Sequence, residues 1–488
     1  MSSTDKTESV HPSEIRSLAG DGNLKMARER TRLMSPEDQA SVEPLLACLE
    51  VTETKFLQEK SETALSLLDV AVDLGLAPVD RARWAGRIYE NARDGSPAME
   101  ILEEAMRMSP MHPEVPYRLV RLLISAARHQ EAWEVLGNLP PEVAARPLLD
   151  LAECRLLQAE GRFEEIVTKL TELGPRRMPI LENERLSLLT TALDRTNRGR
   201  EAVIEASRRR AMESSSFDEE RFLDLVARRL AEPMPAEPAP VTSGAPKMLF
   251  IMAAFRSGTT LVERMIADHP DAHGIGESEI VRSVIWRKAV DGIEPEADFA
   301  PILNTLREHH GQAQLFVAKN VDLWYMLPRL IGRFPNPRFL VLTRDPIEIG
   351  LSMWKSSLSA EQFPFLARID WIGWYLGICR AALEHWISIP GLPLSSIDYA
   401  DLIREPEAAE SLVWKAAGLE PPTEAGTSTP ASPSLTGPRT ISSNFAAAPV
   451  KTVDRGNRAE EFGEDLTTFQ EAYERGRSRL HAIFPPAV

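Results

Sequence analysis

The stretch of residues 247–261, KMLFIMAAFRSGTTL, constrains the fold of this 488-residue chain more than any other. Its first part, 248–252, is an unbroken apolar run, which is typical of a strand buried on both faces. A turn of small and polar residues follows, and apolar residues then recur at helical spacing. A strand, a turn and a helix in this order direct backbone N–H groups and a helix N-terminus toward an anion. The stretch therefore predicts an anion-binding loop, formed by Arg256, Ser257, Gly258, Thr259 and Thr260.

This loop differs at two positions from the Walker A pattern G-x-x-x-x-G-K-[ST] of nucleoside-triphosphate sites. Ala253 occupies the position of the first glycine, and Thr259 replaces the lysine. Arg256 supplies a cation inside the loop instead. The pattern favours a phosphate site without the triphosphate-binding lysine. The alternative is an ordinary strand–turn–helix corner with a polar turn.

Length and charge limit the organisation and the partners of the chain. At 488 residues it is too long for one hydrophobic core, so we expect several domains. Its 56 basic and 72 acidic residues give a net charge of −16, which opposes binding to nucleic acid. The polar start, the lack of a membrane-length apolar run and three widely separated cysteines predict a cytoplasmic protein without a membrane span.

Residues 46–230 read as successive helices in which one position repeats. Small or apolar residues recur there with spacings of 34, 34, 34 and 36, at Ala64, Ala98, Ala132, Ile166 and Ala202. The unit around Ala98 resembles the tetratricopeptide repeat (TPR) most clearly, because it also has Gly86, Tyr89, Leu102, Ala105 and Pro110. After a polar, helical segment at 1–45, we expect a divergent α-helical TPR-like solenoid of about four or five units. The alternative is an irregular helical bundle.

A linker at 231–246 with five prolines separates this region from a different texture at 247–488. There, apolar strand candidates alternate with helix candidates, which predicts an α/β domain with a parallel sheet covered on both faces. The predicted strands are 248–252, 315–318, 339–343 and 394–397, and the predicted helices are 261–268, 323–334, 347–357, 371–387 and 400–417. The polar, proline-rich stretch 421–438 is predicted to be a mobile insertion.

A second basic site follows the strand predicted at 339–343. Arg344 comes just after this strand, Asp345 and Pro346 open the next helix, and Ser352 lies eight residues after Arg344. Ligands bind outside the carboxyl ends of parallel strands, so Arg256 and Arg344 are expected to face one crevice. A guanidinium and a hydroxyl suit a phosphate monoester. Alone, the Arg-Asp-Pro sequence would be better explained by an ion pair that caps a helix, but the presence of the first loop favours the phosphate site.

Together these motifs resemble those of the PAPS-dependent sulfotransferases, where PAPS is 3′-phosphoadenylyl sulfate. The resemblance rests on RSGTT after a strand, HPDAHGIGE at 269–277, and RDP with a serine eight residues after its arginine. It covers 247–488 and is closest to the bacterial TPR-containing and the related tyrosylprotein sulfotransferases. It implies a P-loop-like sulfotransferase domain that takes PAPS as co-substrate. The loop 256–260 would hold the 5′-phosphosulfate, and Arg344 with Ser352 would hold the 3′-phosphate.

The resemblance also implies two catalytic residues. The family's base is a glutamate in the region of HGIGESE, which makes Glu277 the candidate and Glu279 the reserve. Related enzymes carry a lysine after a strand, and Lys319 occupies that place, where it would contact the bridging and leaving oxygens. Each could instead be an ordinary surface residue. The flanking Ala318 and Asn320 depart from the family's acid and proline.

The adenosine end of the nucleotide matches the family less closely. Tyr399 corresponds to the tyrosine of a Y-E-D-L-like motif, and Ser442 lies where the family folds a loop over the nucleotide. Ser443, Lys451, Arg455 and Arg458 accompany Ser442 in that stretch. His385 and Trp386 also echo the family, but helix packing explains both. No metal is expected, because no set of His, Cys or Asp residues has the spacing of metal ligands.

The leading hypothesis is a sulfotransferase that moves a sulfuryl group from PAPS to a hydroxyl of a peptide, a glycan or a small metabolite. The TPR-like surface would bind the acceptor or a protein partner. One alternative is a TPR scaffold that binds adenosine 3′,5′-bisphosphate (PAP) or PAPS without turnover. The altered loop and the altered surroundings of Lys319 motivate this alternative. Another is a P-loop kinase for a small molecule.

Overall fold

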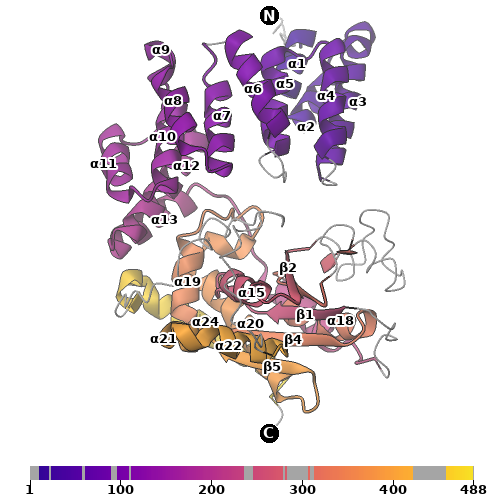
Figure 1. Cartoon of the computed structure of the whole chain (residues 1–488), viewed down its shortest axis with the longest axis vertical. Helices are drawn as coiled ribbons and strands as arrows, with labels where there is room; N and C mark the ends of the chain where they lie inside the picture. The colour runs from indigo at the N-terminus through magenta and orange to yellow at the C-terminus, as the bar shows by residue number, and fades with distance from the viewer. Residues whose placement is uncertain are drawn as a thin grey trace, which may run out of the picture. The chain divides into compact units, whose positions relative to one another are not determined.

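The computed structural model of the protein (Figure 1) describes residues 10–20, 23–57, 61–89, 96–108, 111–235, 246–278, 281–282, 306–307, 313–321, 323–420 and 458–486. The chain divides into two compact units, Met1–Leu173 and Gly174–Val488. The insertion predicted at 421–438, together with Glu279, Ser442, Ser443, Lys451 and Arg455, lies outside the described residues.

The described part of the N-terminal unit consists of helices joined by turns. Consecutive helices pack on one another, and Ala64, Leu102, Ala105 and Ala132 lie in their shared core. The repeated position falls in α4, α6, α8 and α11, which are each the second helix of a pair. The helical N-terminal region is therefore confirmed, and its assignment to TPR repeats remains a prediction. Its helices are α1 (Pro12–Gly20), α2 (Leu24–Thr31), α3 (Pro36–Leu57), α4 (Ser61–Asp73), α5 (Pro78–Tyr89), α6 (Ser96–Met108), α7 (Glu114–Ser125), α8 (His129–Gly137), α9 (Pro141–Ala144), α10 (Pro147–Ala159) and α11 (Phe163–Leu173).

Three further helices belong to the C-terminal unit, although they fall within the predicted repeat region of 46–230. They are α12 (Pro179–Arg195), α13 (Gly199–Arg210) and α14 (Glu219–Leu230). Val203 of α13 and Leu223 of α14 share one buried cluster with Phe250 of the sheet. The compact units therefore divide before these helices, whereas the proline-rich composition had placed the boundary after them.

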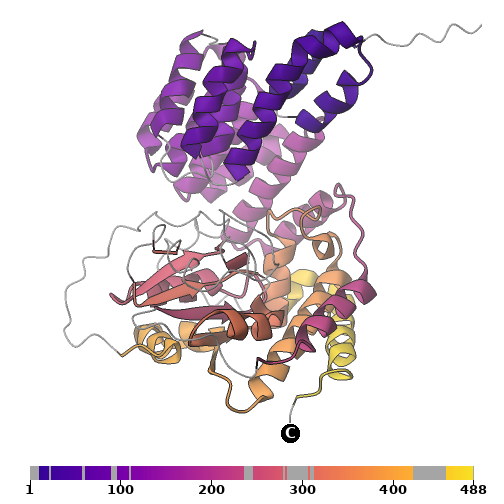
Figure 2. The ribbon, with the colours of Figure 1, turned by 90° about the vertical axis from the view of Figure 1, so that its right-hand side faces the viewer.

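One parallel sheet, built from five strands of the described residues, organises the C-terminal unit (Figure 2). The strands are β1 (Lys247–Met252), β2 (Ala272–Gly276), β3 (Leu315–Ala318), β4 (Pro337–Thr343) and β5 (Leu394–Asp398). Their order is β2-β3-β1-β4-β5, and in register Phe250 of β1 lies between Ala318 of β3 and Phe339 of β4. The strand order reverses at β1 and β4, which is where ligands bind in sheets of this kind.

Alternate residues of β1 enter two different cores, one on each face of the sheet. Met248 and Phe250 pack with the helices of one face, and Leu249 and Ile251 pack with those of the other. The first face is covered by α14, η1 (Leu323–Tyr325), α18 (Leu327–Arg333), α19 (Pro346–Trp354), η2 (Pro364–Ala367), α20 (Ile369–Ser388) and α24 (Asp465–His481). The second face is covered by α15 (Thr259–Ala267), α21 (Tyr399–Arg404) and α22 (Pro406–Ala417), while η3 (Arg458–Phe462) packs on α13 and α19.

The predicted parallel sheet is confirmed, with three corrections to its elements. All four predicted strands are present, but β2 was missed. The helix predicted at 400–417 is two helices that meet at Glu405, because the following proline disfavours the helical conformation of the residue before it. The helix predicted at 323–334 is likewise divided into η1 and α18, with a proline in the first turn of α18.

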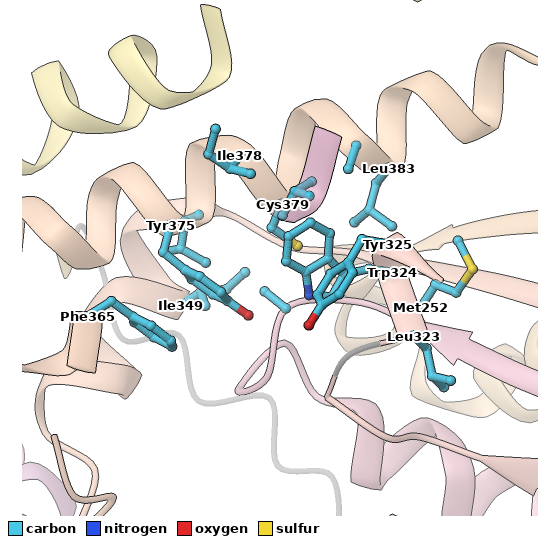
Figure 3. Close-up of a cluster of buried hydrophobic side chains, with 14 of the residues drawn as sticks. Met252, Leu323, Trp324, Tyr325, Ile349, Phe365, Tyr375, Ile378, Cys379 and Leu383 are labelled. Atoms are coloured by element: carbon cyan, nitrogen blue, oxygen red, sulfur yellow. The ribbon is translucent and has the colours of Figure 1, made fainter. Parts of the chain in front are cut away.

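Below the carboxyl end of β1 lies a buried cluster rich in aromatic side chains. In Figure 3, Met252 lies on one side of Trp324 and Tyr325, and Tyr375 and Phe365 lie on the other side. The rings of Phe365 and Tyr375 are stacked, with centroids 4.0 Å apart. Phe255 of the loop after β1 packs against this pair, with its ring centroid 5.6 Å from that of Phe365 and 6.0 Å from that of Tyr375. None of the helices formed by the described residues combines the length and the hydropathy needed to cross a lipid bilayer.

Candidate functional site

The carboxyl end of every strand in the described sheet is followed by a residue that the sequence had singled out. In sheet order these are Glu277 after β2, Lys319 after β3, the loop from Arg256 after β1, Arg344 after β4 and Tyr399 after β5. Parallel strands bring their carboxyl ends to one edge of the sheet. The structure thus arranges these residues, which are separated by up to 143 positions in the chain, in one row.

The loop after β1 takes its shape from two residues with left-handed backbone angles. Arg256 has φ 70° and Gly258 has φ 101°, whereas neither Ala253 nor Ala254 has a positive φ. A non-glycine residue in the left-handed region is costly and is concentrated at functional sites. The replacement of the Walker glycine by Ala253 is therefore tolerated, because the tight part of the turn lies three residues later.

Arg256 and Arg344 are in direct contact. The Nη1 of Arg344 donates a hydrogen bond to the carbonyl oxygen of Arg256 at 3.4 Å, and the Nε of Arg256 donates to the Oγ of Ser352 at 3.2 Å. Arg344 also pairs with Glu348 in the first turn of α19. The loop after β1, the strand end that precedes α19 and α19 itself therefore present two guanidiniums and a hydroxyl together, a set that suits an anion with several oxygens.

A third arginine, which belongs to none of the sequence motifs, acts on this pair. Burial, followed by the positive charges of Arg344 and Arg195, holds the pKa of Arg256 below its ordinary value. Arg195 is the last residue of α12. Its neighbour Asp194 accepts a hydrogen bond from Lys355, which follows α19, and lies 3.0 Å from Arg458. Motif spacing gives no sign of a cation contributed from so far upstream.

Tyr399 joins Arg344 to the loop after β1. Its ring lies under the Arg344 guanidinium, with 4.3 Å between the guanidinium carbon and the ring centroid, a cation–π arrangement. A Cβ on Gly258 would collide with the same ring. The backbone of Gly258 therefore lies against Tyr399 because no side chain intervenes.

Replacing Gly258 with alanine is expected to weaken both the fold and the anion site. The left-handed conformation costs a non-glycine residue about 1–2 kcal/mol, and the added methyl displaces Tyr399 from Arg344. Gly391→Ala is the matched control, since Gly391 has φ 81° and a methyl group added there would have no atom within 4 Å. Urea unfolding should show a similar loss of stability in both variants, and only Gly258→Ala should also bind inorganic phosphate more weakly in calorimetry. Equal affinity in the two variants would contradict the role of the Tyr399 contact.

Lys319 and Glu277 form the other half of the row. The Lys319 side chain is buried, with 3% of its surface exposed, and its Nζ lies 3.7 Å from Oε1 of Glu277. The Glu277 side chain remains 33% exposed, so it can meet a molecule that enters from solvent. A second carboxylate, that of Glu263 in α15, lies 3.8 Å from the same Nζ. Glu263 was not among the predicted site residues.

A pocket of about 510 Å³ opens beside Arg344 and Tyr399. Its far wall comes from α20 and α24, which supply Arg380, Glu384, Tyr473 and Arg477. Burial alone would raise the pKa of Glu384, but hydrogen bonds from Arg380 and Arg477 outweigh it and hold the pKa below its ordinary value. The pocket wall is therefore charged and fixed in place by ion pairs.

Two other predicted features have structural partners of their own. His385 packs against Phe484, and Trp386 donates its indole N–H to the carbonyl oxygen of Trp324 at 2.9 Å, as expected for helix packing. Arg458 is buried in ion pairs with Asp194 and Glu461. Within the described ranges, no group of three or more His, Cys, Asp or Glu side chains is arranged to hold a metal ion.

Comparison with known proteins places the row of site residues within a known family of domains. Residues 246–423 match the model of the Sulfotransferase family. A protein of Aquifex aeolicus (strain VF5), described only as uncharacterized, is 25% identical over 354 residues. That match covers 66% of this chain and 45% of the relative, so the chain spans less than half of the relative's length. The crystal structure of a sulfotransferase from Alicyclobacillus acidocaldarius is 15% identical with a TM-score of 0.29, and the match covers 49% of this chain and 96% of that one. Because the family match includes β1 to β5 and the described site residues from Arg256 to Tyr399, the chain carries a sulfotransferase-family domain at 246–423.

Proposed function

We propose that the protein transfers a sulfuryl group from PAPS to a hydroxyl of a peptide, a glycan or a small metabolite. The observation that carries the proposal is the row at the carboxyl edge of the sheet, where a glutamate, a lysine and two arginines follow adjacent parallel strands. The match of this region to the Sulfotransferase family supports the same reaction class.

Glu277 and Lys319 have complementary roles in the proposed reaction. The acceptor oxygen attacks the sulfur atom of PAPS, and its proton passes to the carboxylate of Glu277. The bond between sulfur and the bridging oxygen breaks, and the negative charge that develops on this oxygen is stabilised by the ammonium of Lys319. The products are the sulfated acceptor and PAP. The Nζ of Lys319 lies 3.7 Å from Oε1 of Glu277, and this proximity supports a shared role for the two residues.

The other end of the row is assigned to the nucleotide. The loop of Arg256, Ser257, Gly258, Thr259 and Thr260 would hold the 5′-phosphosulfate at the N-terminus of α15. Arg344 and Ser352 would hold the 3′-phosphate, and Tyr399, with the pocket beside it, would contact the adenosine. Two phosphate groups on one ligand account for the presence of two arginines on neighbouring strand ends.

Arg344→Ala is expected to lower the affinity for PAP roughly 10- to 100-fold, since a charge-assisted hydrogen bond contributes about 1.5–3 kcal/mol. The matched control is Arg329→Ala. Arg329 is also partly buried and pairs with Glu232 at 2.7 Å, but it lies in α18 before β4 begins. Isothermal titration calorimetry with PAP measures both variants. An affinity unchanged in Arg344→Ala would refute the assignment of the 3′-phosphate.

Transfer assays then separate the proposed enzyme from its two rivals. Radiolabelled PAPS is incubated with p-nitrophenol, a tyrosine-containing acidic peptide and a sulfatable oligosaccharide. Label in any acceptor supports the enzyme, whereas tight PAP binding without label in any of them supports a scaffold. ATP that displaces PAP from the site would instead support a kinase.

The helical N-terminal region is proposed to recognise a large acceptor or a protein partner. Stacked helix pairs of the TPR type present extended surfaces to peptides. Removing this region should then impair sulfation of a peptide more than that of p-nitrophenol. Equal loss with both acceptors would contradict a role in acceptor binding.

A further inference from the structure

Lys319 lies between two carboxylates at the carboxyl edge of the sheet. Its Nζ is 3.7 Å from Glu277 and 3.8 Å from Glu263, and neither distance is that of a direct hydrogen bond, which is about 2.7–3.2 Å. Because the lysine side chain is almost completely buried, nearby carboxylates rather than solvent must balance its charge. The nearly equal distances indicate that the ammonium is divided between them.

Glu263 uses its two oxygens for two different tasks. Oε2 faces Lys319, while Oε1 accepts a hydrogen bond from the backbone N–H of Gly276 at 2.6 Å. Gly276 is the last residue of β2, and Glu277 follows it directly. Glu263 itself lies in the second turn of α15, the helix that begins in the anion-binding loop. One carboxylate therefore connects this helix to the lysine and to the backbone that carries Glu277.

The balance of charges explains why the second carboxylate matters. A lysine side chain is long and flexible, and with Glu277 as the nearer acid it would move into a tight ion pair. Such a pair would keep Glu277 ionised, which makes it a weaker base, and would draw the ammonium away from a leaving oxygen. A second carboxylate at nearly the same distance from the ammonium counters both effects.

We propose that Glu263 is a positioning residue, which holds Lys319 away from Glu277 and fixes the backbone turn before Glu277. This inference rests on the proposed sulfuryl transfer. It assigns to α15 a role beyond the loop at its N-terminus.

The ionisation of Glu263 allows this role to be tested by measuring how kcat depends on pH. Burial raises its pKa above the ordinary value, while the charge of Lys319 and the N–H of Gly276 oppose the rise. The charged groups that act on it are Lys319, which follows β3, and Glu277, which follows β2. Its ionisation therefore moves to higher pH than that of a solvent-exposed glutamate.

Glu263→Gln tests the charge of this residue, because the amide oxygen can still accept from Gly276. With radiolabelled PAPS and p-nitrophenol, kcat should fall roughly 10-fold, and the acid limb of its pH profile should move to lower pH by about one unit. PAP affinity should stay unchanged. A kcat profile that coincides with that of the wild type would overturn the proposal.

Glu213→Gln is the matched control. Glu213 also accepts from a backbone N–H, that of Ala360 at 3.2 Å, and it also pairs with a buried cation, Arg210 at 2.9 Å. Glu213 lies after α13 rather than at the edge of the sheet, so the pH profile of kcat in Glu213→Gln should match that of the wild type. The same displacement of the acid limb in both variants would overturn the proposal.

A second measurement does not depend on turnover. Hydrogen exchange at the Gly276 amide should be faster in Glu263→Ala than in the wild type, and it should stay slow in Glu263→Gln. Equal exchange in the wild type and Glu263→Ala would overturn the inference even in an active enzyme. A wild type that neither binds PAP nor transfers label would refute the proposed function instead, while the exchange data still decide whether Glu263 fixes the turn.

Discussion

Glu277→Gln is expected to lower the rate of sulfuryl transfer about 10²- to 10⁴-fold. Glutamine matches glutamate in size but cannot take the proton of the acceptor hydroxyl. Lys319 keeps its other carboxylate partner, Glu263 at 3.8 Å, so its burial remains compensated. PAP affinity should be preserved, because Arg344 and Ser352 act from β4 and α19. The measurement is transfer of label from PAPS to p-nitrophenol, together with calorimetry of PAP binding.

The control for Glu277→Gln is the same change of acid to amide at an exposed position. Asp268→Asn provides it, since Asp268 follows the C-terminal end of α15 and faces solvent. Its turnover should equal that of the wild type. If Glu277→Gln retains full turnover, the base must be another residue, and Glu279 is the next to test.

Arg210→Met is expected to destabilise the fold by about 3–5 kcal/mol, the usual cost of removing one partner of a buried ion pair. The Arg210 side chain is 1% exposed and pairs with Glu213 at 2.9 Å. It also donates to the carbonyl oxygens of Leu358 at 2.6 Å and Met353 at 3.1 Å, which lie at and beyond the end of α19. Methionine fills much of the space but cannot donate to the carbonyl oxygen of Leu358, whereas the carbonyl oxygen of Met353 keeps Ser356 as a donor. Urea unfolding of the full chain, followed by tryptophan fluorescence, measures the loss.

Arg208→Met separates this effect from the general effect of losing an arginine. Arg208 lies in the same helix and pairs with Glu205 at 2.7 Å, but its side chain is 63% exposed. Exposed pairs contribute about 0–1 kcal/mol, so this variant should unfold nearly as the wild type does. A loss below about 1 kcal/mol in Arg210→Met would show that the carbonyl oxygens find other donors, and our account of this contact would fail.

Local patterns were sufficient for the parts of the fold that bury continuous apolar runs. The runs at 248–252, 315–318 and 339–343 predicted three central strands, because a strand buried on both faces has no need of polar residues. The segment AHGIG that forms β2 has only two aliphatic side chains. It also contains two glycines, and glycine disfavours strands. Its pairing with β3 comes from tertiary contacts that a local pattern does not record.

The site was predictable where a motif fixes a position in the chain, as for Arg256, Arg344 and Ser352. Glu263 was not predictable, because a glutamate among apolar residues reads as the solvent face of an amphipathic helix. Only the fold brings it to Gly276 and Lys319. Arg195 was missed for the same reason, since it is separated from Arg256 by 61 positions and belongs to a region that was assigned to repeats.

The ion pairs among Asp194, Lys355, Arg458 and Glu461 have a consequence for how this polypeptide can be dissected or recombined. These ion pairs connect residues before residue 246 and residues after residue 423 with each other and with Lys355, which lies between those limits of the family match. A piece excised at those limits would leave Lys355 with neither of its two acidic partners. A piece that keeps these ion pairs must therefore extend at least from α12 through η3, and a graft onto another protein would have to carry both flanks together.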